Sequence, residues 1–399
     1  MAKVLISFLG TGPKDGNRNY KCAPYKFSDG TIKETPFIAK ALAEYYQIDR
    51  IILIGTVKSM WEEVYRQFAE AKGIIDEDIY FEIAGACDAA HHDSDLFLPH
   101  QNVIEEVLGT DSHVMLIKYG LNEEEVNANA TTILGIDQYL DRKDELYIDI
   151  THSFRSLPLF LMNCLIYLKN VSDKDISIAH ITYGMLDVIG ELRYAPVVEL
   201  NEFITTNEWI SGAYSFAEFG NAYKIAQLLE EENKDVAKRL NRFSDLMNLN
   251  HLSGIQHEAQ SLSGIKNKNY SSPLPEMIVK PVITRFINDF IDESRQSHFQ
   301  GKLACWQFHH KNYCASYISL LEAIVTLKCE EMNMDSEEYD NRKKAKDELK
   351  KRKGKLFTLY ENVKNNRNTI AHSIRGSQNY TQMINVLEQS IQDFFKILN

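Results

Sequence analysis

The chain has 399 residues and a formal net charge of −12 at pH 7. A single hydrophobic core rarely serves more than about 250–300 residues, so this length predicts two domains. The negative charge argues against a protein coated with basic surface for duplex DNA, although a local basic groove stays compatible with it. No stretch approaches the ~20 apolar residues of a membrane helix, so we expect a soluble, cytoplasmic protein without membrane contact.

The first 205 residues alternate short apolar runs with amphipathic stretches. Strands are expected at residues 4–10, 50–56, 113–120, 145–151 and 176–184. Helical patterns lie between most of them, and one of these begins with Thr35 as a plausible N-cap and Pro36 at the first helical position. Strands separated by helices predict a parallel sheet buried on both faces. We therefore predict an α/β Rossmann-like domain over residues 1–205.

From residue 206 to 399 the apolar positions recur at helical spacing, which predicts an all-α domain. Residues 261–276 are rich in Ser, Asn, Gly and Pro and form the expected internal loop. Residues 342–355 are densely basic. This run is either a solvated helix face or mobile loop, or a patch that tracks phosphates.

The six cysteines are scattered and form no CxxC pair, so neither a zinc ribbon nor a disulfide framework is expected. Cys305, His309, His310 and Cys314 do share one short stretch. We interpret it as a partly buried helix with ordinary polar residues, and we expect no metal site.

Ligands of open parallel sheets bind beyond the carboxyl ends of the strands. Small and hydroxylated residues follow the predicted strands in the stretches 10–12, 55–61, 149–156 and 182–184. Such residues let a ligand approach backbone N–H groups, which phosphate prefers at a helix N-terminus. Arg155 adds a permanent cation, so we expect a nucleotide-type ligand. His152 is a donor to that ligand, a general base or a structural hydrogen-bond partner; the sequence leaves all three open.

The layout resembles the CRISPR-associated ribonucleases of type III systems that join a CARF sensor domain to a HEPN domain. The resemblance rests on the segments LISFLGTG, ILIGTVKSMW, LIKYGLNEEE, DITHSFRSLPL, ITYGMLD and RNTIAH. DITHSFRS looks like the Asp-x-Thr-His-Gly signature of that family, with Ser153 where glycine is commoner. Residues 230–340 match the family only loosely.

The resemblance implies a homodimer whose CARF domain binds a cyclic oligoadenylate as activator. Cyclic tetra-adenylate is the first expectation and cyclic hexa-adenylate the second, with no other cofactor and no stable complex with the type III effector. The implied ligand-binding residues are Gly10, Thr11, Gly12, Thr56, Thr151, His152, Ser153 and Arg155.

The resemblance also implies that Arg367, Asn368 and His372 form the HEPN motif, an Arg-x4-His pattern that cuts single-stranded RNA without metal. Histidine can transfer protons when the 2′-OH attacks phosphorus, and arginine can stabilise the phosphorane oxygens. Positions five apart on an ideal helix point about 140° away from each other. Either the motif straddles a helix start, or one active site draws on two chains.

Two rival functions remain open. The first is a non-catalytic, ligand-sensing regulator whose helical domain binds nucleic acid or a protein partner. The second is a nucleotide-modifying Rossmann enzyme with its chemistry in the DITHSFRS stretch. Opening of the activator ring by Thr151 and His152 is a further hypothesis.

Overall fold

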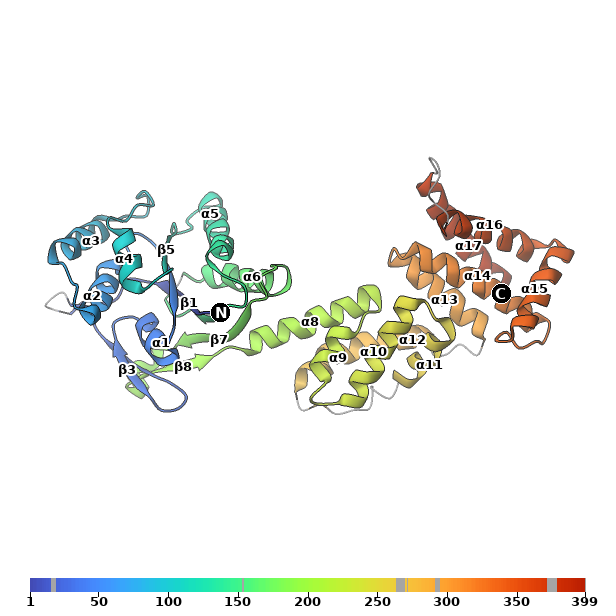
Figure 1. Ribbon diagram of the computed structural model, residues 1–399, viewed down its shortest axis with the longest axis horizontal. Coiled ribbons are helices and arrows are strands. Elements are labelled where there is room, and N and C mark those ends of the chain that lie inside the picture. Colours follow the sequence, from blue (N-terminus) through green and yellow to red (C-terminus); the bar gives the residue numbers. More distant parts are fainter. Residues whose placement is uncertain are drawn as a thin grey trace. The chain divides into compact units, whose positions relative to one another are not determined.

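The computed structural model describes residues 1–15, 19–152, 154–262, 270, 272–290, 295–371 and 379–398. The chain divides into two compact units, Met1–Thr205 and Thr206–Asn399, and the boundary falls within helix α8 (Glu202–Phe219). Figure 1 labels the elements of both units. The first unit is α/β and the second is helical, which confirms the predicted fold class.

One mixed sheet organises the described part of the first unit, in the order β3-β2-β8-β7-β6-β1-β4-β5. The strands are β1 (Lys3–Leu9), β2 (Ala23–Lys26), β3 (Ile32–Thr35), β4 (Arg50–Gly55), β5 (His113–Leu116), β6 (Glu145–Asp149), β7 (Ser177–Gly184) and β8 (Ala195–Glu199). The segment from β7 to β5 is parallel, as predicted. The prediction did not include the antiparallel pairs on one side of the sheet, where β8 runs antiparallel to β7 and β3 runs antiparallel to β2.

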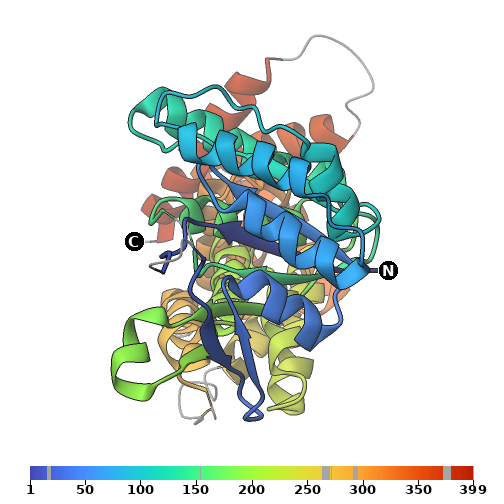
Figure 2. The same cartoon turned by 90° about the vertical axis from the view of Figure 1, so that its left-hand side faces the viewer.

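The helices of the first unit bury both faces of the sheet. They are α1 (Ile38–Tyr46), α2 (Trp61–Lys72), α3 (Glu77–Ala89), α4 (Gln101–Leu108), α5 (Glu123–Leu134), α6 (Leu157–Asn170) and α7 (Ile189–Leu192), with the short turns η1 (Gly135–Tyr139) and η2 (Leu186–Val188). Alternate residues of β1 enter two different cores. Leu5 and Leu9 pack with α1 to α4, whereas Ile6 and Phe8 pack with α5 and α6. Figure 2 shows this unit facing the viewer.

The predicted start of the first helix is wrong. Thr35 ends β3, where it pairs with Ala23, and α1 begins at Ile38 with Phe37 as its N-cap. The physical reason is the proline that follows Thr35, because a residue before proline is driven into extended backbone and fits a strand end. The Thr35 hydroxyl donates to the Phe37 carbonyl at 3.3 Å instead of capping the helix.

The second unit is built from helices around two apolar cores. Its elements after α8 are α9 (Tyr223–Leu229), α10 (Lys234–Leu249), α11 (Leu252–Leu262), the π-helical turn η4 (Pro275–Val279), α12 (Lys280–Phe290), α13 (Gln296–His309), α14 (Tyr313–Glu331), α15 (Tyr339–Arg352), α16 (Lys355–Ala371) and α17 (Tyr380–Leu398). One core gathers α9 to α12, and the other gathers α14, α16 and α17. Most of the expected loop at 261–276 lies outside the described residues. Among the helices of the described ranges, none combines the length and apolarity needed to cross a membrane.

Candidate functional site

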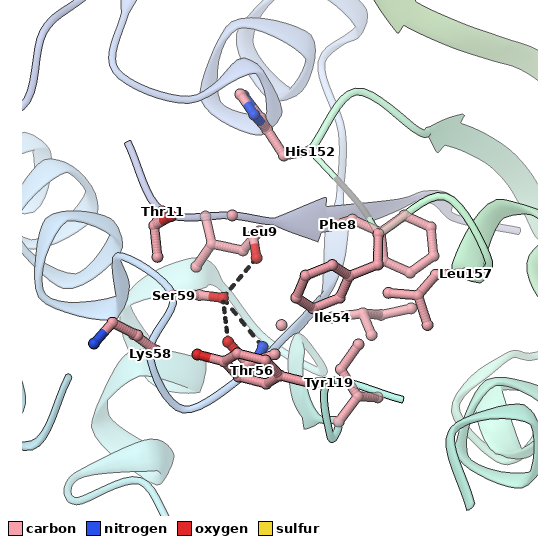
Figure 3. Close-up of a pocket in the computed structure, with 14 residues that line it drawn as sticks. Phe8, Leu9, Thr11, Ile54, Thr56, Lys58, Ser59, Tyr119, His152 and Leu157 are labelled. Atoms are coloured by element: carbon pink, nitrogen blue, oxygen red, sulfur yellow. Dashed lines mark hydrogen bonds between the residues drawn. The ribbon is translucent and has the colours of Figure 1, made fainter. Parts of the chain in front are cut away.

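A cavity of about 420 Å³ opens at the carboxyl ends of β1, β4 and β6 (Figure 3). These strands and β5 are parallel neighbours, so the segments that follow them meet at one edge of the sheet. The lining residues are Phe8, Leu9, Gly10, Thr11, Ile54, Gly55, Thr56, Lys58, Ser59, Ile117, Tyr119, His152, Phe154 and Leu157. The cavity therefore lies where an open parallel sheet is expected to hold a ligand.

Ser59 links the backbone segments of Leu9 and Thr56, which line this cavity. Its buried hydroxyl donates to the Leu9 carbonyl at 2.7 Å and accepts from the Thr56 backbone N–H at 3.1 Å. Figure 3 shows Ser59 between these two residues. A Cβ at Gly55 would lie only 2.8 Å from Ser59 Oγ and 3.0 Å from the Leu9 carbonyl oxygen. Glycine is favoured there, because the Ser59 and Trp61 side chains and the Leu9 carbonyl leave no room for a Cβ at the end of β4.

Aromatic rings and a helix start supply the groups that a nucleotide needs. The Tyr119 and Phe154 rings lie with their centroids 5.4 Å apart, and Phe154 is 44% exposed. Exposed aromatic faces can stack on nucleobases. Helix α6 begins at Leu157 on the cavity wall, and its N-cap residue Ser156 does not cap it with its own side chain. The Leu157 N–H donates to the Phe154 carbonyl at 2.9 Å and Pro158 has no N–H, so an anion near this helix start would be favoured by the positive end of the helix dipole.

A buried carboxylate ties together the ends of two strands beside the cavity. Asp149 has no exposed surface, and burial raises its pKa to about 6 against the opposing hydrogen bonds from Ser7 and Thr151. Ser7 Oγ donates to this carboxylate at 2.6 Å, and the Thr151 hydroxyl donates at 2.5 Å. Thr151 Oγ1 in turn accepts from the Gly184 N–H at 2.7 Å. The Thr151 hydroxyl thus joins the end of β6 to the end of β7.

His152 contributes to the cavity wall, but its ring is directed away from Thr56 and Ser59 (Figure 3). Its Nε2 lies 3.3 Å from the hydroxyl of Tyr25. Burial lowers the pKa of His152 to about 4, so the imidazole is neutral at physiological pH. Burial also raises the pKa of Tyr25, so this contact joins two neutral groups.

Helix α16 carries Arg367 and Asn368 near its carboxyl end, and both side chains are half-buried. Leu359, Tyr360 and Val363, one to two turns earlier, are buried in the second core of the unit. Within the described ranges, no side chain or backbone group forms an ion pair or hydrogen bond with the Arg367 guanidinium.

Comparisons with known proteins show which family the chain is related to. Over 433 aligned residues the chain is 33% identical to CRISPR-associated protein MJ1674 of Methanocaldococcus jannaschii, covering all of this chain and 68% of that protein. The chain belongs to this CRISPR-associated family. Residues 4–186 match the model described as the CARF domain of the CRISPR system endoribonuclease Csx1, and residues 205–295 match the model of the MJ1674 second domain.

A solved structure of Enterococcus italicus Csm6, bound to cyclic hexa-2′-fluoro-hexa-dAMP, is also similar to the chain. The identity is 12%, and the match covers all of this chain and 94% of that one. The TM-score of 0.40 is too low to establish a common fold. The assignment to the CRISPR-associated, CARF-containing family therefore rests on MJ1674 and on the two domain models.

The CARF domain brings together half of the residues that the sequence pointed to as ligand contacts. Gly10, Thr11, Thr56 and His152 line the cavity. Gly12 packs against other residues, since a Cβ there would lie 2.6 Å from Met60 Cε. Arg155 is exposed and does not line the cavity, and Thr151 directs its hydroxyl to Asp149. Ser153 lies outside the described residues.

Among the lining residues that sequence reasoning did not name as ligand contacts are Lys58, Ser59, Tyr119 and Phe154. Lys58, Ser59 and Phe154 do lie in the strand-end stretches 55–61 and 149–156 that the sequence pointed to. Tyr119 follows β5 in the same way. The Lys58 stem lines the cavity while its ammonium donates to the Ala90 carbonyl at 3.1 Å.

The HEPN-type motif is only partly described. His372 lies outside the described residues, and Arg367 lies near the end of α16 rather than at a helix start. The explanation that the motif straddles a helix start is therefore wrong for Arg367. A site that draws on two chains stays a prediction.

The basic run is mostly helical, because α15 covers its residues up to Arg352. Arg342 is held by Glu322 and by the Ser336 carbonyl, and Arg352 pairs with Glu348 at 2.7 Å. Four lysines of the run are exposed on α15: Lys343, Lys344, Lys350 and Lys351. Both a solvated face and a phosphate-tracking patch are compatible with this helix.

The stretch with two cysteines and two histidines shows helical packing. His309 Nδ1 lies 2.8 Å from the Cys305 carbonyl and 3.6 Å from Cys305 Sγ, and the His310 ring packs on Trp306 with centroids 4.1 Å apart. Cys314 is exposed. In the part of the chain that the structure describes, no group of three His, Cys, Asp or Glu side chains is arranged to hold a metal ion.

Proposed function

We propose that the protein is a cyclic-oligoadenylate-activated, metal-independent endoribonuclease of type III CRISPR antiviral defence. It acts as a homodimer on single-stranded RNA in the cytoplasm. The observation that carries the proposal is the cavity at the strand ends of the domain that matches the CARF model of an endoribonuclease. Arg367 on α16, which has no ion-pair or hydrogen-bond partner for its guanidinium among the described residues, supports the catalytic half of the proposal.

The cavity offers the chemistry that an adenylate requires. Tyr119 and Phe154 provide stacking faces, Thr11 and Thr56 provide hydroxyls, and the positive end of the α6 dipole favours a phosphate. A volume of about 420 Å³ suits one drug-sized ligand, and a cyclic oligonucleotide is considerably larger. A two-fold dimer would therefore hold a symmetric ring between two such cavities. Cyclic tetra-adenylate is the first candidate and cyclic hexa-adenylate the second.

The proposed reaction is attack of the RNA 2′-OH on the adjacent phosphorus. The bond from phosphorus to the 5′-oxygen breaks, and the products are a 2′,3′-cyclic phosphate and a 5′-OH. The 2′-OH loses one proton and the leaving 5′-oxygen gains one, and His372 is the proposed proton-transfer group. Arg367 stabilises the charge on the phosphorane oxygens, and Asn368 hydrogen-bonds the phosphate or orients the histidine.

Activation requires that the ring bind one arrangement of the dimer better than another. Ring-opening by Thr151 and His152 receives no support from their contacts. The Thr151 hydroxyl is engaged with Asp149 and Gly184, and the His152 ring contacts Tyr25. Neither side chain directs its functional group at the cavity.

The test is cleavage of a fluorescent single-stranded RNA in EDTA, with and without cyclic tri-, tetra- or hexa-adenylate. We expect cleavage with one ring only. Loss of one preorganised donor to developing charge costs roughly 10²–10³-fold in rate, which is the expected effect of Arg367→Ala. His372→Ala should abolish cleavage as well, whereas Arg285→Ala removes an exposed arginine of α12 as a matched control and should cleave normally.

Absence of cleavage with every ring, in a folded dimer, would refute the nuclease for those activators. Full antiviral activity of His372→Ala and Arg367→Ala in cells would instead favour the regulator that binds nucleic acid or a protein partner.

A further inference from the structure

We infer that a groove between α10 and α11 binds the phosphate backbone of the single-stranded RNA substrate. The inference rests on the proposed function, and it concerns the region that matches the MJ1674 second domain. Figure 1 shows the two helices next to each other. The groove encloses about 400 Å³ and is lined by Asp235, Lys238, Arg239, Arg242, His257, Glu258 and Ser261. None of these residues takes part in the ligand cavity or in the Arg-x4-His motif.

The groove is built from two helical faces. Asp235, Lys238, Arg239 and Arg242 follow each other at spacings of three, one and three residues, so they share one face of α10. Arg239 and Arg242 are offset by about 4.5 Å along the helix axis. A row of cations along one helix suits a linear polyanion better than a single compact anion. On α11, Ser261 and His257 are four residues apart on the face that lines the groove.

A buried carboxylate positions the cations. Glu258 is 5% exposed, and its Oε1 forms an ion pair with Arg242 Nε at 2.9 Å. Its Oε2 accepts a hydrogen bond from the Ser261 hydroxyl at 3.1 Å. Arg239 Nη1 donates to the Ser261 carbonyl at 3.4 Å. Glu258 thus holds Arg242 and the Ser261 carbonyl holds Arg239, so less rotamer entropy is lost when Arg239 binds phosphate.

The charge of the groove differs from the charge of the chain. The whole chain carries −12, whereas the groove gathers three permanent cations against two carboxylates. Arg242 already neutralises Glu258. Lys238 has no ion-pair partner among the described residues and is exposed. Lys238 and Arg239 thus remain, against the single carboxylate of Asp235, to contact phosphates, and binding should release counterions.

The test is the binding of a fluorescein-labelled oligouridylate of about 20 nucleotides to the full-length chain, measured across salt concentrations in EDTA. All proteins carry Arg367→Ala, so that the probe is not cut. Each phosphate contact contributes about 0.7 to the salt slope on single strands. Lys238→Gln with Arg239→Gln should therefore lower the slope by about 1.4 and weaken binding roughly 25-fold at 0.1 M salt. Lys238→Gln alone should lower the slope by about 0.7, or roughly 5-fold.

The matched control is Arg285→Gln with Lys311→Gln, which removes the same charges from exposed positions of the second unit outside the groove. The control should bind RNA with the parent slope. The inference would be overturned if the groove double variant and the control double variant lost equal RNA affinity. It would also be overturned if the groove variants lost no RNA affinity.

This experiment separates the groove from the nuclease. RNA binding that depends on the groove, in a protein that no ring activates, would leave the groove in place and remove the proposed activation. Ring-dependent cleavage, together with groove variants that bind RNA normally, would instead keep the proposed activation and remove the groove.

Discussion

The buried Asp149 predicts a pH-dependent cost to the stability of the first unit. Burial raises its pKa from 3.8 to about 6, despite the hydrogen bonds from Ser7 and Thr151. The folded protein therefore binds this proton more tightly than the unfolded chain does, and stability falls as pH rises through this window. At 1.36 kcal/mol per pH unit, the full cost above pH 6 is about 3 kcal/mol. Asp149→Asn removes the charge and keeps an oxygen that can accept from Thr151.

We expect the unfolding free energy of Asp149→Asn, relative to the parent, to rise by about 2–3 kcal/mol between pH 4 and pH 7. The assay is urea unfolding followed by tryptophan fluorescence in a background with Trp209→Phe and Trp306→Phe. The chain has three tryptophans, so Trp61, which is buried in the first unit, becomes the sole reporter. Other carboxylates titrate alike in both proteins and cancel. A difference that stays constant from pH 4 to pH 7 would show that Asp149 ionises normally, and the reasoning would be wrong.

Two further predictions concern the cavity. Gly55→Ala should destabilise the first unit by about 1–3 kcal/mol through overpacking against Ser59 and the Leu9 carbonyl. Gly85→Ala, with open space around its Cβ, is the thermal-unfolding control, and equal melting temperatures would refute the close packing. Tyr119→Ala should weaken binding of the activating ring by roughly 5–150-fold, the equivalent of about 1–3 kcal/mol for one stacked base. Phe81→Ala, an exposed aromatic outside the cavity, should bind normally in the same titration, and an unchanged affinity of Tyr119→Ala would exclude stacking there.

The central strands were predictable because their short, continuous apolar runs are typical of strands that are buried on both faces. β1, β4 and β6 are almost fully buried, and each run ends in small or polar residues. The hairpin of β2 and β3 was missed, because its strands have four residues each and β2 contains a proline. Their strand conformation comes from pairing with each other and with β8, which local sequence does not show.

The cavity was predictable in position but not in detail. The rule for strand ends found Thr56 and His152, because it depends only on where strands stop. It could not show that the Thr151 hydroxyl is occupied by Asp149 and Gly184, since the Gly184 contact joins positions 33 residues apart. The groove of α10 and α11 was also missed, because its cations and its carboxylate come from two helices.

The place of β8 in the sheet has a consequence for synthesis on the ribosome. β8 (Ala195–Glu199) pairs with β7 on one side and with β2, close to the amino terminus, on the other. The hairpin of β2 and β3 therefore has no neighbouring strand until nearly 200 residues have left the exit tunnel, and its open edge is a hazard for misassembly in that interval. A chain cut after residue 186, where the match to the CARF model ends, would lack the strand that joins this hairpin to the rest of the sheet.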